Sequence, residues 1–554
     1  MKKTSLIPFL FAGSVVSIAV LTASTAVGKS KPSARSAGPS AKTIRANQTT
    51  PGLVPAAAAA PARATMPSSA SPALQRQLSE ALTMARNGQY QQAAPVLFAL
   101  SRRNELQAER MQIKYILGLS LSELKLYQTA AFQFVDVIRN GGSHYVRQSI
   151  DRLSIAADAL GDDTLLNYAI SKVRLDEFPE KQKEVIYFRL GEIKLRNGQF
   201  AEAADLFSRV SPGSRYASTA KFNRGLALLE SRKPAEALPL FQSLNHGRAQ
   251  ASVTDVNKVS SKLAIARTYY QMQDWDKAVE AYREIPRDSE YWHQALFELS
   301  WAELRAAKFR STLSNMQSLH SAFYEDSYIP ESLLIRSIVY LYICKFEETD
   351  KTLNLFEKTY DPVRNSISHF LETTRDPLQY FAEAEKAFYI RKDKKAASGM
   401  ILPYMAIRSI LDEGNVKRSF QYLKALTDEK GRIEVLPAIA RSALGPYALR
   451  VLANRFKNAK VANGEFVRAH LQNMKKDLDD FFEQAGFIRY EMINGKKELL
   501  KKRIAGKEVP KALIDEKMDR VFYVQNGYEY WPFDGEYWLD EIGNYHYLGQ
   551  QSCE

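Results

Sequence analysis

The sequence predicts an all-α protein whose main part is a solenoid of stacked helix pairs. The first observation is a pattern of small and large residues that recurs between residues 74 and 360. The second is composition: 45% of the 554 residues are hydrophobic and 25% are charged, as is ordinary for a folded protein. This composition argues against a multi-span membrane protein and against a wholly disordered chain. We therefore expect folded repeats over about half of the chain.

Each repeat unit combines three positions. An early small residue is followed twelve positions later by a second small residue, and four positions after that by a large apolar residue. Seven units fit, and their second small residues are Ala93, Ala130, Ala203, Ala237, Ala278, Thr312 and Thr349. The intervals between them are 37, 73, 34, 41, 34 and 37 residues. Because 73 is two periods, we expect a degenerate unit around residues 145–176, which gives about eight helix pairs.

The three positions have a physical reason. Small residues let two helices approach closely, and the large residue, on the same helical face, fills the gap between them. One pair cannot bury its apolar face alone, so neighbouring pairs must stack. The pattern resembles the tetratricopeptide repeat (TPR) over residues 74–360. It departs from that family near the start of the first helix, where the family has Trp and this sequence has Gln77, Lys114, Lys221 and Lys262.

The resemblance implies a concave groove, lined by the first helix of each pair, that binds peptides or other proteins and does not catalyse a reaction. It places large or charged side chains on or near this groove: Tyr115, Phe188, Glu192, Phe222, Arg267, Phe297 and Trp301. Such a groove would be mostly apolar and would suit a helix or a hydrophobic segment. The alternative is that these side chains form the core between repeats.

The N-terminal region predicts export. Lys2 and Lys3 precede an apolar run that continues without a charge to Gly28, as in a secretory signal peptide. The expected location is the periplasm; the alternative is an uncleaved helix, residues 1–28, that anchors the chain in the inner membrane. Residues 29–73, rich in Ala, Pro and Ser, predict a disordered basic linker.

The charge distribution bears on the partners. Residues 1–73 hold eight Lys or Arg and no acid, so the rest of the chain has a net charge of only 14 − 8 = +6. We therefore expect no nucleic-acid partner. The linker could act as a spacer or could contact peptidoglycan or an anionic lipid surface.

Beyond residue 360 we expect further helices. Residues 361–460 predict an α-helical region, with helices at about 376–392, 399–412 and 415–427 and punctuation at Pro437 and Gly445–Pro446. Residues 461–520 predict one long helix or a helical hairpin with a basic end. Such a helix could pair within the chain or form a homo-oligomer.

The last 34 residues differ from the rest, since residues 521–554 hold ten aromatic residues, six acids and no Lys or Arg. Residues 522–531 predict a β-hairpin with its turn at Asn526–Gly527, and Gly543–Asn544 suggests a second turn. We expect this tail to dock on the helices or on a partner. The docking candidates are Trp531, Phe533 and Trp538.

A second resemblance lies in residues 531–545, which read WPFDGEYWLDEIGNY. This stretch resembles the C-terminal signature of exported TPR proteins of the adventurous-gliding-motility type from gliding and predatory Gram-negative bacteria. It implies a periplasmic or outer-membrane-associated part of an envelope machine, and it brings no catalytic residues with it.

The two cysteines, Cys344 and Cys553, could form a disulfide, because exported chains lie where disulfides persist, or could stay unpaired. Phosphate-loop, zinc-protease and nucleophile-elbow motifs are absent, and the seven histidines show no metal-ligand spacing. We expect no cofactor and no metal.

The sequence thus predicts a non-enzymatic periplasmic scaffold that binds other envelope proteins. One alternative is a cell-wall-binding or envelope-assembly factor. Another is a glycan hydrolase that uses Asp534 with Glu536 or Asp540 with Glu541.

Overall fold

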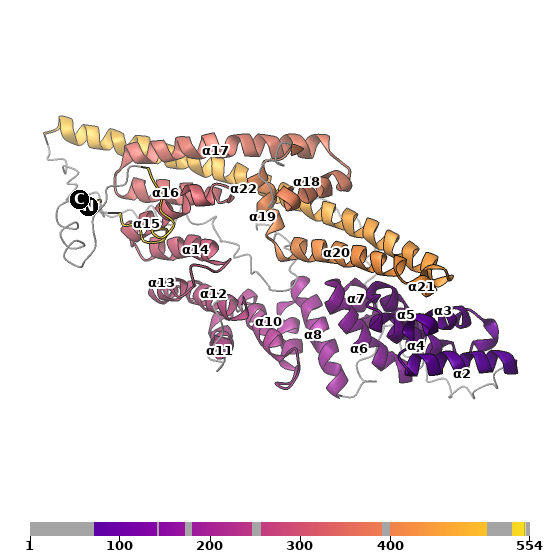
Figure 1. Cartoon of the computed structure of the whole chain (residues 1–554). Coiled ribbons are helices and arrows are strands. Elements are labelled where there is room, and N and C mark those ends of the chain that lie inside the picture. Colours follow the sequence, from indigo (N-terminus) through magenta and orange to yellow (C-terminus); the bar gives the residue numbers. More distant parts are fainter. Residues whose placement is uncertain are drawn as a thin grey trace, which may run out of the picture. The chain divides into compact units, whose positions relative to one another are not determined.

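The computed structural model describes residues 71–140, 143–171, 180–245, 256–390, 399–506, 535–547 and 549. The regular secondary structure of these residues is helical, and none of them forms a strand (Figure 1). The predicted signal or anchor segment 1–28 and nearly all of the linker 29–73 lie outside the described residues. None of the described helices combines the length and apolar composition needed to cross a membrane.

Sixteen helices in residues 72–373 form eight consecutive pairs. Their bounds are α2 (Pro72–Arg86), α3 (Tyr90–Ser101), α4 (Arg110–Glu123), α5 (Tyr127–Asn140), α6 (Ser143–Leu160), α7 (Thr164–Ile170), α8 (Glu180–Arg196), α9 (Phe200–Ser208), α10 (Ala217–Glu230), α11 (Pro234–Asn245), α12 (Val256–Gln271), α13 (Trp275–Arg283), α14 (Trp292–Arg305), α15 (Phe309–Leu319), α16 (Pro330–Tyr342) and α17 (Phe346–Thr373). Short 3-10 turns cover Asn104–Leu106 and Ala322–Tyr324. The pair α6 and α7 fills the double interval, as the period predicted.

The predicted packing between small and large residues is confirmed at three glycines. A Cβ added at Gly118, Gly191 or Gly225 would lie 2.5–2.7 Å from a ring carbon of Phe134, Phe207 or Phe241, respectively. Each phenylalanine is the large residue of its own unit. The absence of a side chain on the first helix therefore makes the room that the ring on the second helix occupies.

The turns inside the pairs share one backbone feature. Non-glycine residues adopt positive φ at Lys125 (60°), Arg232 (59°), Gln273 (62°), Ala307 (56°) and Cys344 (58°), and Gly88 and Gly198 do so at the matching places. These positions recur at the same intervals as the small anchors. The left-handed residue ends the first helix of the pair and reverses the chain into the second.

Five more helices follow: α18 (Pro377–Ile390), α19 (Tyr404–Leu411), α20 (Gly414–Glu434), α21 (Pro437–Ala440) and α22 (Leu444–Ile504). The predicted long helix is a single one, and it begins earlier than residue 461. Gly445 and Pro446 do not interrupt it, because they lie in its first turn, where the missing N–H of proline has no helical partner to lose.

The chain divides into two compact units. One consists, among the described residues, of 71–171 together with 425–453, and the other of 180–424 together with 454–506 and the described tail. Helices α20 and α22 contribute to both.

In the first unit, the returning segment caps a repeat helix. The Glu429 carboxylate accepts hydrogen bonds from the backbone N–H groups of Gln128 (2.7 Å) and Thr129 (2.9 Å) at the start of α5. The hydroxyl of Thr129 donates to the same carboxylate at 2.7 Å. Nearby, the ring of Tyr447 lies 5.0 Å from that of Phe98 on α3. Residues 425–453 are therefore part of the core of the first repeats.

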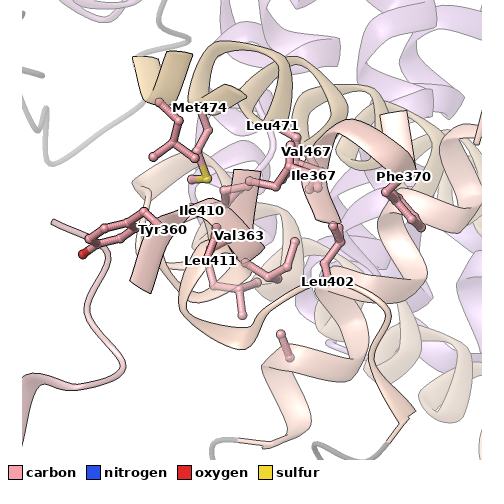
Figure 2. Close-up of a cluster of buried hydrophobic side chains, with 14 of the residues drawn as sticks. Tyr360, Val363, Ile367, Phe370, Leu402, Ile410, Leu411, Val467, Leu471 and Met474 are labelled. Carbon is pink, nitrogen blue, oxygen red and sulfur yellow. The ribbon is translucent and has the colours of Figure 1, made fainter. Parts of the chain in front are cut away.

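In the second unit, α17 and α22 enclose an apolar cluster together with α19 (Figure 2). Ile367 of α17, Ile410 of α19 and Leu471 of α22 are almost fully buried in it. Farther along α22, Arg489 forms ion pairs with Asp350 and Glu357 of α17, both at 2.9 Å. The long helix thus pairs within the chain, one of the two alternatives left open, and pairing between chains stays a prediction.

The predicted β element of the tail is not supported. The hairpin 522–531 lies outside the described residues, and the described part of the tail, 535–547 and 549, has turns and no strand. The N–H of Asn544 donates to the carbonyl of Glu541 at 2.8 Å, with Gly543 at φ 85°, so a turn lies next to the one predicted.

Candidate functional site

Three aromatic groove candidates pack against neighbouring rings. Tyr115 lies 6.2 Å from the ring of Phe134 in its own pair and 5.5 Å from that of Tyr145 in the next. Phe188 stacks on Tyr216 at 4.5 Å, and Phe222 meets Phe241 edge-on at 5.5 Å. The alternative of a core between helices accounts for these contacts.

The two charged candidates are buried in ion pairs. Glu192 pairs with Arg189 of the same helix at 2.9 Å. Arg267 of α12 donates twice to Glu298 of α14, at 2.8 and 2.6 Å, and the hydroxyl of Tyr282 on α13 donates to the same carboxylate. Burial, together with the Glu298 charge, raises the pKa of Tyr282 well above its ordinary value. This cluster joins three successive helices.

Phe297 and Trp301 of α14 belong to an apolar cluster of the second unit, where Trp301 is buried and Phe297 partly so. Burial raises the pKa of Glu331 to about 7; a hydrogen bond from Trp301 opposes this shift, and the charge of Asp477 on α22 adds to it. A role of the seven candidates in binding stays a prediction.

Other contacts tie later helices to the same region. Arg408 of α19 lies 3.5 Å from Asp326, and Lys417 of α20 lies 3.4 Å from Glu290. Burial and the nearby charge of Arg408 lower the pKa of His293 to about 4. Helix α19 therefore approaches the loop before α16, and helix α20 approaches the loop before α14.

The clearest binding geometry lies on α15. Four of its side chains contact the tail at residues 537–549, and together with Arg287 they form what we call the tail-binding surface: Arg287, Arg310, Ser314, Gln317 and Ser318. The four α15 residues are spaced by four, three and one, so they lie on one face of the helix. Figure 1 draws this part of the tail, in yellow, beside α15.

Most of these contacts go to the tail's main chain. Ser318 accepts a hydrogen bond from the N–H of Gly543 at 2.8 Å, and Ser314 accepts one from the N–H of Tyr547 at 2.9 Å. Arg310 donates to the carbonyl of Gly549 at 2.8 Å. Backbone recognition of this kind holds a non-helical segment, and the side chains that it buries add specificity.

Arg287 adds two contacts, to the carbonyl of Ile542 at 3.4 Å and to the side-chain oxygen of Asn544 at 2.6 Å. Gln317 donates to the hydroxyl of Tyr537 at 3.1 Å. Their contacts at Tyr537 and Asn544 lie on either side of Ile542 in the tail sequence.

The anchor of the tail is Ile542, which is 4% exposed. Beside it, a Cβ on Gly543 would lie 2.7 Å from the ring of Trp292, so only glycine fits between the tail and α14. The ring of Tyr547 meets that of Tyr340 on α16 edge-on.

None of the three predicted docking residues of the tail is seen to anchor it. Trp538 is 58% exposed and does not dock through burial, while Trp531 and Phe533 lie outside the described residues. Sequence reasoning missed Ile542, because it ranked anchors by aromatic size. The adjacent glycine was the signal for a close approach.

Two further predictions concern single side chains. Cys344 is disulfide-bonded, whereas Cys553 lies outside the described residues, so the pairing of the two stays a prediction. Asp540 and Glu541 are exposed, and Asp534 is not among the described residues. Within the described ranges no group of three or more His, Cys, Asp or Glu could hold a metal ion.

Comparisons with known proteins agree with the repeat geometry. Tetratricopeptide repeat models match residues 78–144 and 188–251, and a further one matches residues 261–288. Protein O-mannosyl-transferase Tmtc3 of Drosophila melanogaster is 28% identical over 201 residues, which are 35% of this chain. The match spans only 20% of that protein's length.

Two solved structures are weakly similar. The apo form of RapI has a TM-score of 0.33 at 14% identity and covers 65% of this chain and 99% of its own. A Rap protein complexed with Competence and Sporulation Factor has a TM-score of 0.24 at 10% identity and covers 72% and 100%. Both similarities are too low to bear on fold or function. The matched repeat models, which lie on α2–α5 and on α8–α13, identify this chain as one that contains tetratricopeptide repeats.

Proposed function

We propose that this chain is a non-enzymatic protein-interaction scaffold of the bacterial cell envelope, exported to the periplasm. Repeat pairs of this type offer extended surfaces to other proteins. The observation that carries the proposal is the tail-binding surface, where a repeat helix already holds a non-helical segment by its main chain.

The cellular setting rests on the sequence. The charge and hydropathy of residues 1–28 support export, and residues 531–545 support an envelope machine of the gliding-motility type. The partners are other envelope proteins, and the basic linker would add contact with peptidoglycan or anionic lipid. The N-terminal segment could instead remain as an inner-membrane anchor.

Site-specific photo-crosslinking in living cells tests the proposal. A photo-reactive amino acid at Gln317 would probe the tail-binding surface, and one at the exposed Lys277 on α13 would serve as the control position. We expect Gln317 to crosslink the chain's own tail and, in a chain that ends at residue 534, to crosslink envelope proteins. Crosslinks to cytoplasmic proteins alone, or an equal pattern from Lys277, would refute the proposal.

A further inference from the structure

The C-terminal end of α22 continues past the helix that covers it. Phe346 is the first residue of α17, and a Cβ added at Gly495 would lie only 2.6 Å from its ring. Before that point α22 has buried side chains, among them Ile488 and Met492. From residue 496 to residue 504 none is buried. In the last turns of the helix, only Leu499 is even partly buried, and the other side chains are exposed.

This part of α22 exposes an apolar stripe made of Phe487, Tyr490, Ile493, Leu500 and Ile504. Their exposed fractions run from 55% to 80%. The spacing of three, three, seven and four residues keeps them on one side of the helix. Burying such a stripe against an apolar phase would be favourable.

Basic side chains border the stripe. Residues 496–504 contain five bases, Lys496, Lys497, Lys501, Lys502 and Arg503, and a single acid, Glu498. Given the helical period, Lys496 and Arg503 flank the stripe on one side, and Lys497 and Lys501 flank it on the other. Only Lys501 has an ion pair among the described residues, with Glu498 at 2.7 Å.

The charge excludes some occupants. A second copy of this helix would bring a net +4 against +4 over residues 496–504, which repels. The acidic tail of the same chain is engaged elsewhere in its described part, on α15. The occupant must therefore be anionic and must offer an apolar interior next to its charges.

We infer that residues 487–504 of α22 dock on an anionic phospholipid membrane. The stripe enters the boundary between headgroups and acyl chains, and the flanking lysine and arginine side chains reach the phosphates. A helix that lies in the plane of the interface in this way does not span the bilayer. This surface is distinct from the tail-binding surface.

Vesicle flotation of the full chain tests the inference. We expect binding to vesicles of phosphatidylcholine with phosphatidylglycerol, weak binding to phosphatidylcholine alone, and loss of binding as salt rises. Replacing Lys496, Lys497, Lys501 and Arg503 by Gln should weaken binding about a hundredfold or more. The control variant, with the same charge change at exposed Arg102, Arg103, Arg232 and Lys233, should bind nearly as the unmodified chain does.

A second variant, Leu500→Ser with Ile504→Ser, removes the last two residues of the stripe and keeps the charge. Both positions are exposed, so the fold should persist, and binding should fall about tenfold or more. Hydrogen exchange should show new protection at residues 496–506 on anionic vesicles, which separates this site from any contribution of residues 1–73.

Three results would overturn the inference: no flotation of the unmodified chain, equal flotation of the basic and control variants, or no new protection in α22. A fourth such result could come from sedimentation velocity without lipid. A dimer that the Leu500→Ser, Ile504→Ser variant abolishes would assign the stripe to a second copy.

Discussion

The left-handed residue in each repeat turn is a strained choice wherever it is not glycine. Ala307 has φ 56°, where a Cβ is unfavourable by about 1 kcal/mol. We predict that Ala307→Gly raises the unfolding free energy by about 0.5–1 kcal/mol, since relief of strain exceeds the added freedom of the unfolded chain. The preceding residue, Ala306, has φ −78° and serves as the control, because glycine there should destabilise. Urea unfolding of both variants measures the difference, and a loss of stability in Ala307→Gly would contradict the prediction.

At the same scale, the burial of His320 predicts that stability depends on pH. Burial, with the charge of Arg336 adding to it, lowers the pKa of His320 from 6.5 to about 3. Because arginine can only donate, Nδ1 of His320 accepts from Arg336 (3.2 Å), so Nε2 carries the proton and donates to Ser332 (2.8 Å).

The sign follows from proton uptake. The unfolded chain protonates this imidazole below pH 6.5, and the folded chain does so only near pH 3, so its contribution to stability is lost as pH falls through that window. We predict that the stability advantage of the unmodified chain over His320→Gln shrinks by about 2–3 kcal/mol between about pH 7 and pH 4.5.

Comparing the unmodified chain with His320→Gln also separates His320 from groups that stabilise the fold as pH falls. Burial raises the pKa of Glu303 to about 7, so that carboxyl binds a proton in the folded chain first and stabilises it as pH falls. This contribution is common to both proteins and cancels in the difference. Unfolding by urea at each pH gives the values, and a difference that does not change with pH would exclude the assigned role of His320.

At the scale of the element, the helix pair depends on a glycine facing a ring. We predict that Gly225→Ala destabilises the second unit by about 1–3 kcal/mol, since the new methyl group would lie 2.5 Å from the ring of Phe241. Gly486→Ala in α22 is the matched control, because a Cβ added there would meet no neighbouring atom within 4 Å. The better helix propensity of alanine should therefore stabilise the second unit by about 0.5–1 kcal/mol.

The ring itself gives a second check. Adding Phe241→Leu to Gly225→Ala should restore part of the loss, because the smaller side chain leaves room for the methyl group. If the two substitutions add without coupling, Gly225 does not act through Phe241.

What the sequence could predict also differs between elements. The eight pairs followed from it because each pair is local: Gly225 and Phe241 meet within one hairpin of helices. The capping of α5 by Glu429 could not be foreseen, since the carboxylate comes from 300 residues farther along the chain and no local pattern marks it. The tail was expected to dock, yet its anchor proved to be Ile542 rather than Trp538, because fit beside Gly543 decides which side chain is buried.

At the scale of the whole molecule, two compact units predict two unfolding transitions. All five tryptophans fall within residues 178–424 or 454–554, so tryptophan fluorescence reports on the second unit, whereas far-UV circular dichroism reports on the helices of both. We predict that the two signals give transitions that do not coincide in urea.

Single substitutions should then move one transition each. Glu429→Ala leaves the buried N–H groups of Gln128 and Thr129 without their acceptor, which should destabilise the first unit by about 2–4 kcal/mol. We expect it to shift the circular dichroism transition and leave the fluorescence transition in place, while the exposed Glu434→Ala on the same helix shifts neither. Gly225→Ala should move the fluorescence transition. Because α20 and α22 run through both units, the alternative is that these helices transmit the loss; Glu429→Ala would then shift both signals together, and the chain would unfold as one cooperative body.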